Sequence, residues 1–379
     1  MDESLKSSLI CWRRTLHTFP EGGLEEVRTH DYIVSMLEPL KPDKLETIAG
    51  TGVKCVFYGK DRERAIAFRA DMDALQIIDE KTGVEFCSKR EGYMHACGHD
   101  GHMSIALATA HYAKELRDKG LLNISVTVIF QPAEESIGGA WRMIEGGALE
   151  EPHVEHIFGL HLMPDLDIGK IGIKSGALMA GTSELDIVLY GDTAHGAMPH
   201  KGSDAIAAMC HIYTMIQTAI SRENPGDTML FSIGRVDAGT RRNILAGEVT
   251  MQGIARTFSN QSNERLMDII KAAIASAGTM FGIKGELKIF SWYNPVINDD
   301  ADAKRLIELA GDMYYDQPSV MIAEDFSCYL EERPGVFYFL GCGDENHRAG
   351  LHSEFFDFDE QAILIGAKFM RTILDYYNG

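Results

Sequence analysis

The stretch Asn123-Ile-Ser-Val-Thr-Val-Ile-Phe130 decides which class of fold the chain can adopt. It is β-branched and mostly apolar, a pattern typical of a strand that is buried on both faces. Similar runs occur at Arg64-Ala-Ile-Ala-Phe-Arg69 and Ile157-Phe-Gly-Leu-His161, and helical periodicity over 103–116 separates the first of these from 123–130. Buried strands that alternate with helices predict an α/β fold with a central, mostly parallel sheet.

The middle of the chain follows a different pattern. Strand signals alternate with two stretches of helical periodicity in the order β-α-β-β-α-β, at about 184–190, 203–220, 229–236, 248–255, 263–277 and 286–290. That order is typical of a small ferredoxin-like α+β domain. After Asn294-Pro295 the α/β pattern returns, with a strand at 336–340 and a helix at 360–377. We therefore predict an α/β domain built from residues 1–179 and 291–379, with a second domain inserted at 180–290.

The composition excludes several classes of protein. The 379 residues include 56 acidic and 36 basic side chains, which gives a net charge of −20 with histidine neutral. Nucleic-acid binding depends on clustered Lys and Arg, so this acidic excess argues against it. No apolar run approaches the ~20 residues of a membrane helix, and the amino-terminal stretch up to Arg14 lacks the apolar core of a signal peptide. We expect a cytoplasmic protein that binds neither nucleic acid nor membrane.

One histidine-rich segment, Met94-His-Ala-Cys97-Gly-His99-Asp-Gly-His102, predicts metal binding. Cys97 and His99 at positions i and i+2 can direct a thiolate and an imidazole at one point, and the glycines permit the backbone that this requires. A lone cysteine is usually a small buried apolar residue, but such a dense group of donors is hard to explain structurally. The odd number of scattered cysteines, seven, favours reduced thiols.

Further donors follow predicted strands, where open α/β sheets place their ligands. Adjacent Glu134 and Glu135 would repel each other unless a cation lies beside them, so one can ligate a metal while the other acts as general base. His161 ends an apolar run, and His352 follows the strand at 336–340. Together with Cys97 and His99 these residues offer enough donors for two metal ions that share ligands.

These motifs resemble the M20 metallopeptidase superfamily, in particular its amidohydrolase branch of N-acyl amino acid hydrolases, hippurate hydrolases and N-acetyl-diaminopimelate deacetylases. The similarity extends along nearly the whole chain, through Arg14-Thr-Leu-His17-Thr-Phe-Pro-Glu21, Arg69-Ala-Asp71-Met-Asp73-Ala-Leu, Met94 to His102, Phe130-Gln-Pro-Ala-Glu134-Glu135, His195 to His200, Met321-Ile-Ala-Glu-Asp-Phe326 and Leu351-His352. It implies a two-metal catalytic domain and an inserted lid domain that commonly forms a dimer interface.

The resemblance also implies a role for each matching residue. The metal ligands would be Cys97, His99, Glu135, His161 and His352, and the general base would be Glu134. Asp71 and Asp73 match residues that orient and support a ligand. His195 matches a lid histidine that stabilises the oxyanion, in its own chain or across a dimer, and Asn243 matches a lid asparagine that contacts substrate. Independently of the family, Arg241 and Arg242 are candidates to bind a substrate carboxylate.

The predicted reaction is therefore metal-dependent hydrolysis of the amide bond of a small N-acyl amino acid, with the N-acetyl group favoured. Two divalent ions are expected, and a thiolate favours Zn²⁺ whereas histidine and carboxylate also accept Mn²⁺, Co²⁺ or Ni²⁺. An imidazole nitrogen has a single lone pair, so the Cys97 thiolate or a water would bridge the two ions. A homodimer, or a dimer of such dimers, is expected through the lid.

Three alternatives remain at the level of sequence. The first is a metallo-aminopeptidase or dipeptidase of the same fold. The second is a hydrolase that uses Cys97 as nucleophile with His99 or His102 as base. The third is a non-catalytic protein that keeps the fold and binds metal.

Overall fold

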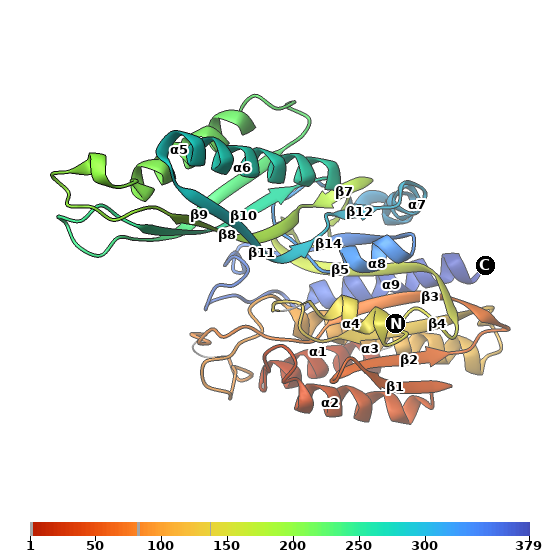
Figure 1. Cartoon of the computed structure of the whole chain (residues 1–379). Coiled ribbons are helices and arrows are strands. Elements are labelled where there is room, and N and C mark those ends of the chain that lie inside the picture. The colour runs from red at the N-terminus through yellow and green to blue at the C-terminus, as the bar shows by residue number, and fades with distance from the viewer. Residues whose placement is uncertain (1–2, 82–83, 137) are drawn as a thin grey trace. The chain divides into compact units, whose positions relative to one another are not determined.

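A computed structural model describes residues 3–81, 84–136 and 138–379 (Figure 1). The chain forms two compact units. The large unit contains Met1–Leu178, Ile297–Pro318 and Asp325–Gly379, and the small unit contains Met179–Val296 and Ser319–Glu324. The first two residues of the amino-terminal stretch considered above lie outside the described residues. Among the residues described, no helix is long and apolar enough to cross a membrane.

The described part of the large unit is built on an eight-stranded sheet. Its strands, in spatial order, are β1 (Lys44–Ile48), β2 (Gly52–Phe57), β4 (Ile124–Gln131), β3 (Asp61–Asp71), β5 (His153–Asp167), β14 (Gly335–Gly343), β6 (Ile171–Ile173) and β13 (Tyr314–Asp316). The four central strands β4, β3, β5 and β14 are parallel. The predicted α/β class is confirmed, and the predicted strands at 64–69, 123–130, 157–161 and 336–340 all lie in this parallel centre.

Toward its edges this mostly parallel sheet includes antiparallel pairs. The hairpin of β1 and β2 joins β4 in antiparallel fashion, and β6 is antiparallel to β14. The hairpin turns at Ala49 and Gly50, which both have positive φ, a conformation that glycine adopts readily. These strands have six residues or fewer, so they carry a weaker periodic signal than the long central ones.

Helices of the large unit pack on this sheet and on one another. They are α1 (Glu3–His17), α2 (Val27–Leu37), η1 (Glu38–Leu40), α3 (His99–Asp118), α4 (Gly139–Glu145), α7 (Asp300–Ala310), η3 (Gly311–Met313), α8 (Ser327–Glu332) and α9 (Gln361–Asn378). The central helix α3 contacts α1, α9 and strands β3 and β4. Its packing fixes its first residue, His99, beside the carboxyl ends of the parallel strands. Strands β7 (Gly176–Met179) and β12 (Val296–Asn298) form a separate two-stranded ladder.

The small unit has the predicted β-α-β-β-α-β order. Its elements are β8 (Gly181–Tyr190), η2 (Pro199–Lys201), α5 (Ala205–Ile220), β9 (Met229–Ala238), β10 (Glu248–Thr257), α6 (Asn260–Phe281) and β11 (Lys284–Tyr293). The strands form an antiparallel sheet in the order β11-β8-β10-β9, as in a ferredoxin-like fold. Asp204 and Ser259 cap the two long helices by accepting hydrogen bonds from backbone N–H groups of the first turn.

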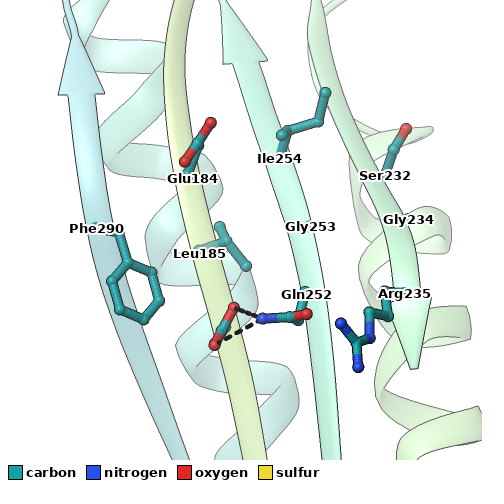
Figure 2. Close-up of a pocket in the computed structure, with 10 residues that line it drawn as sticks. Glu184, Leu185, Ser232, Gly234, Arg235, Gln252, Gly253, Ile254 and Phe290 are labelled. Atoms are coloured by element: carbon teal, nitrogen blue, oxygen red, sulfur yellow. Dashed lines mark hydrogen bonds between the residues drawn. The ribbon is translucent and has the colours of Figure 1, made fainter. Parts of the chain in front are cut away.

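The two faces of this four-stranded sheet differ. Helices α5 and α6 pack with Leu185, Ile187 and other strand residues in an apolar core. A shallow hollow on the sheet is lined instead by Glu184, Gln252, Arg235 and Phe290, among others (Figure 2). There the Gln252 amide donates to the Asp186 carboxylate across 3.4 Å. The polar residues that interrupt the apolar pattern of β8 and β10 therefore mark a face that the unit's own helices leave uncovered.

Candidate metal centre

The Cys97-Gly98-His99 turn brings two metal-binding side chains to the start of α3. Gly98 has φ +84°, and a Cβ at this position would lie 3.1 Å from the Leu162 side chain. Glycine is therefore required both for the backbone conformation and for the close approach of β5. Cys97 and His99 are buried, and their donor atoms lie within 4.8 Å of each other and of His161.

The five predicted ligands meet in space although they are far apart in sequence. The Cys97 Sγ atom lies 3.2 Å from His161 Nε2 and 3.3 Å from His352 Nε2. His352 Nε2 lies 3.1 Å from Glu135 Oε1. Among the described residues, one possible donor group is Cys97, His99 and His161, and another is Cys97, Glu135 and His352. Cys97 belongs to both groups, which is the arrangement that two cations with a shared thiolate require.

His161 departs from its predicted position at the end of a strand. Strand β5 continues to Asp167, and His161 lies within it, opposite Phe339 of β14. The strand continues because β14 runs parallel beside it to Gly343. Parallel pairing with Phe339, which is 178 residues after His161 in sequence, thus extends the strand beyond its apolar run.

The backbone hydrogen bonds of two histidines direct the other nitrogen of each ring toward the donor cluster. The Nδ1–H group of His99 donates to the Asp73 backbone carbonyl at 2.8 Å, and that of His161 donates to the Leu162 carbonyl at 2.7 Å. This fixes the tautomer in which Nε2 carries the lone pair. His99 Nε2 is buried without a hydrogen-bond partner among the described residues, 3.9 Å from Glu135 Oε1. Since buried polar atoms are rarely unpaired, these donors fit a bound cation.

The two adjacent glutamates follow β4 on a constrained loop. Ala133 has φ +58°, and its N–H group donates to the buried Glu26 carboxylate at 2.9 Å. The Glu135 N–H group donates to Asp73 Oδ2 at 3.0 Å. Carboxylate oxygens of Glu134 and Glu135 lie within 4.8 Å of a His99 nitrogen and of each other. Both acidic side chains therefore reach the same donor cluster.

Charges in the cluster favour a cation. Burial, followed by the charges of Glu135 and Glu134, raises the pKa of the Cys97 thiol well above its usual range. Burial opposes protonation of His99, but Asp71 and Asp73 outweigh it and raise its pKa to about 10. Burial also opposes ionisation of Glu135, yet His352 and His99 lower its pKa to about 2. A divalent cation would compete with the protons on Cys97 and His99 while matching the ionised Glu135.

Asp71 belongs to neither of these two donor groups, although a carboxylate oxygen of Asp71 lies within 4.8 Å of nitrogens of His99 and His102. Its Oδ1 accepts from His102 Nδ1 at 2.7 Å, and its Oδ2 accepts from Arg69 at 2.7 Å. The other nitrogen of His102 accepts from the Leu162 N–H group at 2.9 Å. Both ring nitrogens of His102 are thus occupied, which distinguishes it from His99. Sequence reasoning assigned His102 a role only as a base in the alternative with Cys97 as nucleophile, and it assigned Arg69 none, although a charged residue at the end of the apolar run 64–69 was a visible signal.

The predicted substrate-contacting residues belong to the small unit. His195 forms a β-bridge with Ile244, and the Gly196 N–H group donates to the Asn243 carbonyl at 2.8 Å. The His195 Nδ1 atom accepts from the Ala197 N–H group at 3.1 Å. His195, Asn243, Arg241 and Arg242 are all exposed. The structure therefore brings two loop segments together, 195–197 and 243–244, with their polar side chains open to a ligand.

The large unit's fold and donor cluster define a class of protein, a metal-dependent hydrolase with an acidic side chain beside its candidate metal-binding residues. The chain belongs to peptidase family M20/M25/M40, whose sequence pattern matches residues 67–376. The predicted family is confirmed, and so is the predicted class of enzyme, a hydrolase of amide bonds.

Full-length relatives agree with this assignment. The chain is 37% identical to a protein of Bacillus cytotoxicus named N-acetyldiaminopimelate deacetylase, over 98% of both chains. It is 35% identical to a protein of that name from Exiguobacterium sibiricum, over 97% of this chain and 98% of the relative. It is 31% identical to the Bacillus subtilis YXEP protein, whose crystal structure is described as a dinuclear metal-binding peptidase of family M20. That match has a TM-score of 0.87 and covers 100% of this chain and 99% of the other.

Proposed function

We propose that this protein hydrolyses the amide bond of an N-acetyl amino acid, with an N-acetylated diamino acid as the preferred substrate class. The observation that carries the proposal is the pair of donor groups that share Cys97, with Glu134 beside them. The substrate class follows from the names of the relatives at 35% and 37% identity. The dinuclear description of the 31% identical structure supports two divalent ions per chain.

Cys97, His99 and His161 would hold one ion, and Cys97, Glu135 and His352 would hold the other, so that Cys97 would belong to both sets of ligands. Asp71 and Asp73 would orient the histidines through the contacts described above. Bound metal supplies a water of lowered pKa and polarises the substrate carbonyl. Thiolate coordination favours Zn²⁺, and the imidazole and carboxylate donors leave Mn²⁺, Co²⁺ and Ni²⁺ as candidates.

Glu134 is the proposed general base. It takes a proton from the attacking water and later delivers that proton to the departing amine. His195 is proposed to stabilise the oxyanion by donating a hydrogen bond, in its own chain or across a dimer. Asn243 would contact the substrate, and Arg241 and Arg242 would bind its carboxylate. Residues 180–290 would act as the lid and as the interface of a homodimer or a dimer of dimers, and the cytoplasm is the proposed compartment.

The contacts of Cys97 weigh against a cysteine nucleophile. A nucleophilic thiol requires a lowered pKa, whereas burial and the nearby glutamates raise the pKa of Cys97. Of the two hydrolytic alternatives, an aminopeptidase would act on a free α-amine, and the deacetylase names of the 35% and 37% identical relatives favour the N-acyl reaction.

The test combines a substrate screen with one substitution. N-acetyl, N-benzoyl and N-succinyl amino acids, including N-acetylated diamino acids, are offered with Zn²⁺, Mn²⁺, Co²⁺ or Ni²⁺. Glu134→Gln should retain bound metal but lose at least about three orders of magnitude in kcat, because the base and the proton carrier are removed together. The same change at the exposed Glu145 of α4 is the control. Near-normal turnover by metal-loaded Glu134→Gln protein would exclude this role for Glu134.

A further inference from the structure

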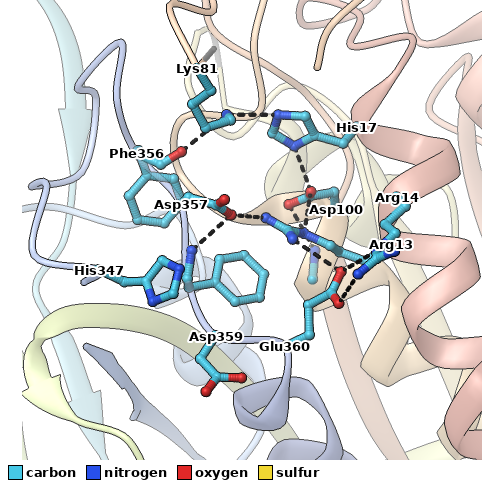
Figure 3. Close-up of polar contacts among 12 residues, drawn as sticks. Arg13, Arg14, His17, Lys81, Asp100, His347, Phe356, Asp357, Asp359 and Glu360 are labelled. Carbon is cyan, nitrogen blue, oxygen red and sulfur yellow. Dashed lines mark hydrogen bonds and ion pairs between the residues drawn. The ribbon is translucent and has the colours of Figure 1, made fainter. Parts of the chain in front are cut away.

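The buried guanidinium group of Arg13 joins two segments that carry proposed metal ligands (Figure 3). Arg13 lies on α1 and is 1% exposed. Its Nε atom donates to Asp100 at 3.2 Å, its Nη1 atom donates to Glu360 at 3.2 Å, and its Nη2 atom donates to Asp357. Asp100 directly follows His99, and Asp357 lies five residues after His352. One buried cation therefore connects ligand segments that are more than 250 residues apart.

The segment that carries His352 depends on such contacts for its position. No helix or strand is present between the end of β14 at Gly343 and the start of α9 at Gln361. His352 itself has φ +63°, and its side chain is 50% exposed. Its N–H group donates to the Ala96 carbonyl at 2.9 Å, one residue before Cys97. A loop residue in this backbone conformation keeps its place only when its surroundings hold it there.

The loop of residues 344–360, called the His352 loop below, is also held in place by contacts near its carboxyl-terminal end. Phe356 and Phe358 are buried, and Arg13 lies over the Phe358 ring at 4.2 Å. Lys81 Nζ donates to the Phe356 carbonyl at 3.1 Å and lies 3.0 Å from His17 Nε2. His17 Nδ1 in turn lies 2.7 Å from Asp100. Two chains of polar contacts thus join the His352 loop to the residue after His99, and only the path through Arg13 uses a single side chain.

Arg14 provides a natural comparison. Its side chain is 48% exposed, and its Nε and Nη2 atoms donate to Glu360 at 2.8 and 2.7 Å. It also lies over the Phe86 ring, at 5.1 Å, as Arg13 does at 4.6 Å. Arg14 therefore shares one carboxylate and one aromatic neighbour with Arg13, but the hydrogen bonds described for it all go to Glu360. Of these two arginines, only Arg13 has described hydrogen bonds to both Asp100 and Asp357.

We propose that Arg13 is a positioning residue for the metal centre, which holds the His352 loop against the His99–Asp100 turn so that both donor groups can close around their ions. The inference rests on the proposed function, because it takes His99 and His352 as ligands. Arg13 does not touch the ions or the substrate. It acts through Asp100 and Asp357, and its loss should loosen the donor group that contains His352 more than the group that contains His99 and His161.

The experiment measures Co²⁺ binding to metal-free protein. Titrations followed by thiolate-to-cobalt absorbance and by competition with a chelator give an affinity for each equivalent, and the melting temperature of the metal-free protein is recorded alongside. The variants are Arg13→Lys, which keeps the charge but cannot span the carboxylates, and Asp357→Asn, which removes the negative charge from the loop side of the link. Arg14→Lys is the matched control. His352→Ala shows which of the two Co²⁺ ions depends on His352.

We expect Arg13→Lys and Asp357→Asn each to lower the affinity for the Co²⁺ ion that depends on His352 by about 10- to 100-fold. This is the usual effect of losing a residue that positions a metal ligand. The affinity for the other Co²⁺ ion should change by less than about threefold. Arg14→Lys should bind both ions with the affinities of the parent protein. The double variant Arg13→Lys/Asp357→Asn should bind about as weakly as either single variant, because both changes break one link.

Two results separate the possible failures. If Arg13→Lys lowers the melting temperature but leaves both affinities at the parent values, Arg13 only stabilises the fold and the inference is wrong. If the parent protein binds no Co²⁺, or if His352→Ala still binds two Co²⁺ ions with the parent affinities, the proposed function is wrong instead. If Arg13→Lys does not fold, unchanged affinities in Asp357→Asn overturn the inference, and a selective loss in that variant supports it.

Discussion

The donor cluster of the large unit and the His195 loop of the small unit are built in opposite ways. Cys97, His99 and His161 are buried, and each of the two histidines has one nitrogen committed to a backbone carbonyl. His195 and Asn243 lie on exposed loops that meet through backbone contacts. A cation needs several donors fixed within a fraction of an ångström, whereas substrate groups tolerate variation in the loops that contact them. Under the proposed function, the metal site is preorganised and substrate preference is set by a more adaptable surface.

The largest effect should come from Cys97→Ala. Because Cys97 belongs to both donor groups, its loss should release both metal equivalents and lower kcat/KM by more than about a thousandfold. Metal analysis of the purified protein and steady-state kinetics measure the two losses. The buried Cys342→Ala variant is the control and should keep its metal. Full metal content with no activity would instead support a cysteine nucleophile.

In the His195 loop of the small unit, His195→Ala should lower kcat by a smaller factor. Removing a hydrogen-bond donor to an oxyanion costs roughly 10²- to 10³-fold in kcat. The metal content should equal that of the parent protein, because His195 belongs to the small unit and the donors belong to the large one. His200→Ala, at the other end of the same turn, is the control. Loss of metal in His195→Ala would show that the two regions are not independent.

Arg241→Ala and Arg242→Ala should have weaker effects. If either guanidinium binds the substrate carboxylate, its loss should raise KM about tenfold and leave kcat nearly unchanged, since a charge-assisted hydrogen bond contributes roughly 1.5 kcal/mol or more. The same substrate with its carboxylate converted to an amide gives the control measurement. An equal change in KM for both substrates would assign the arginine a role other than carboxylate binding.

The last expected effect concerns the stability of the large unit at acid pH and leaves the site itself unchanged. Contacts with His17, the Ser88 N–H group and Lys81 outweigh burial and hold the pKa of Asp79 well below its usual range. A lowered folded-state pKa stabilises the fold above the unfolded value near 4 and loses that effect as the pH falls toward the folded-state value.

Asp79→Asn should therefore reduce the free energy of unfolding by roughly 2 kcal/mol at pH 7 and by progressively less below about pH 4. Urea unfolding of the metal-free protein between pH 3 and 7 measures the difference. Asp31→Asn, at an exposed position, should leave the pH dependence of the parent protein. A constant difference across the pH range would contradict an electrostatic origin.

Much of the fold could be predicted because its central strands and long helices carry strong periodic signals. The apolar runs at 64–69, 123–130, 157–161 and 336–340 became the parallel centre of the sheet. The short strands β1, β6 and β13 were not predicted, because three to five residues at a sheet edge give little periodicity. The continuation of β5 past His161 depends on its partner β14 and could not be seen locally.

The sequence by itself determined the types of donor and their local geometry. The Cys97-Gly98-His99 spacing and the Glu134-Glu135 pair already predict a glycine turn and a nearby cation. Only the tertiary structure decided which histidines are free to bind. His99 and His102 occur in one motif, yet His102 has both nitrogens occupied by Asp71 and the Leu162 N–H group, whereas His99 keeps Nε2 free. Those partners come from strands β3 and β5, so the tautomer of each ring is set by contacts that no local pattern contains.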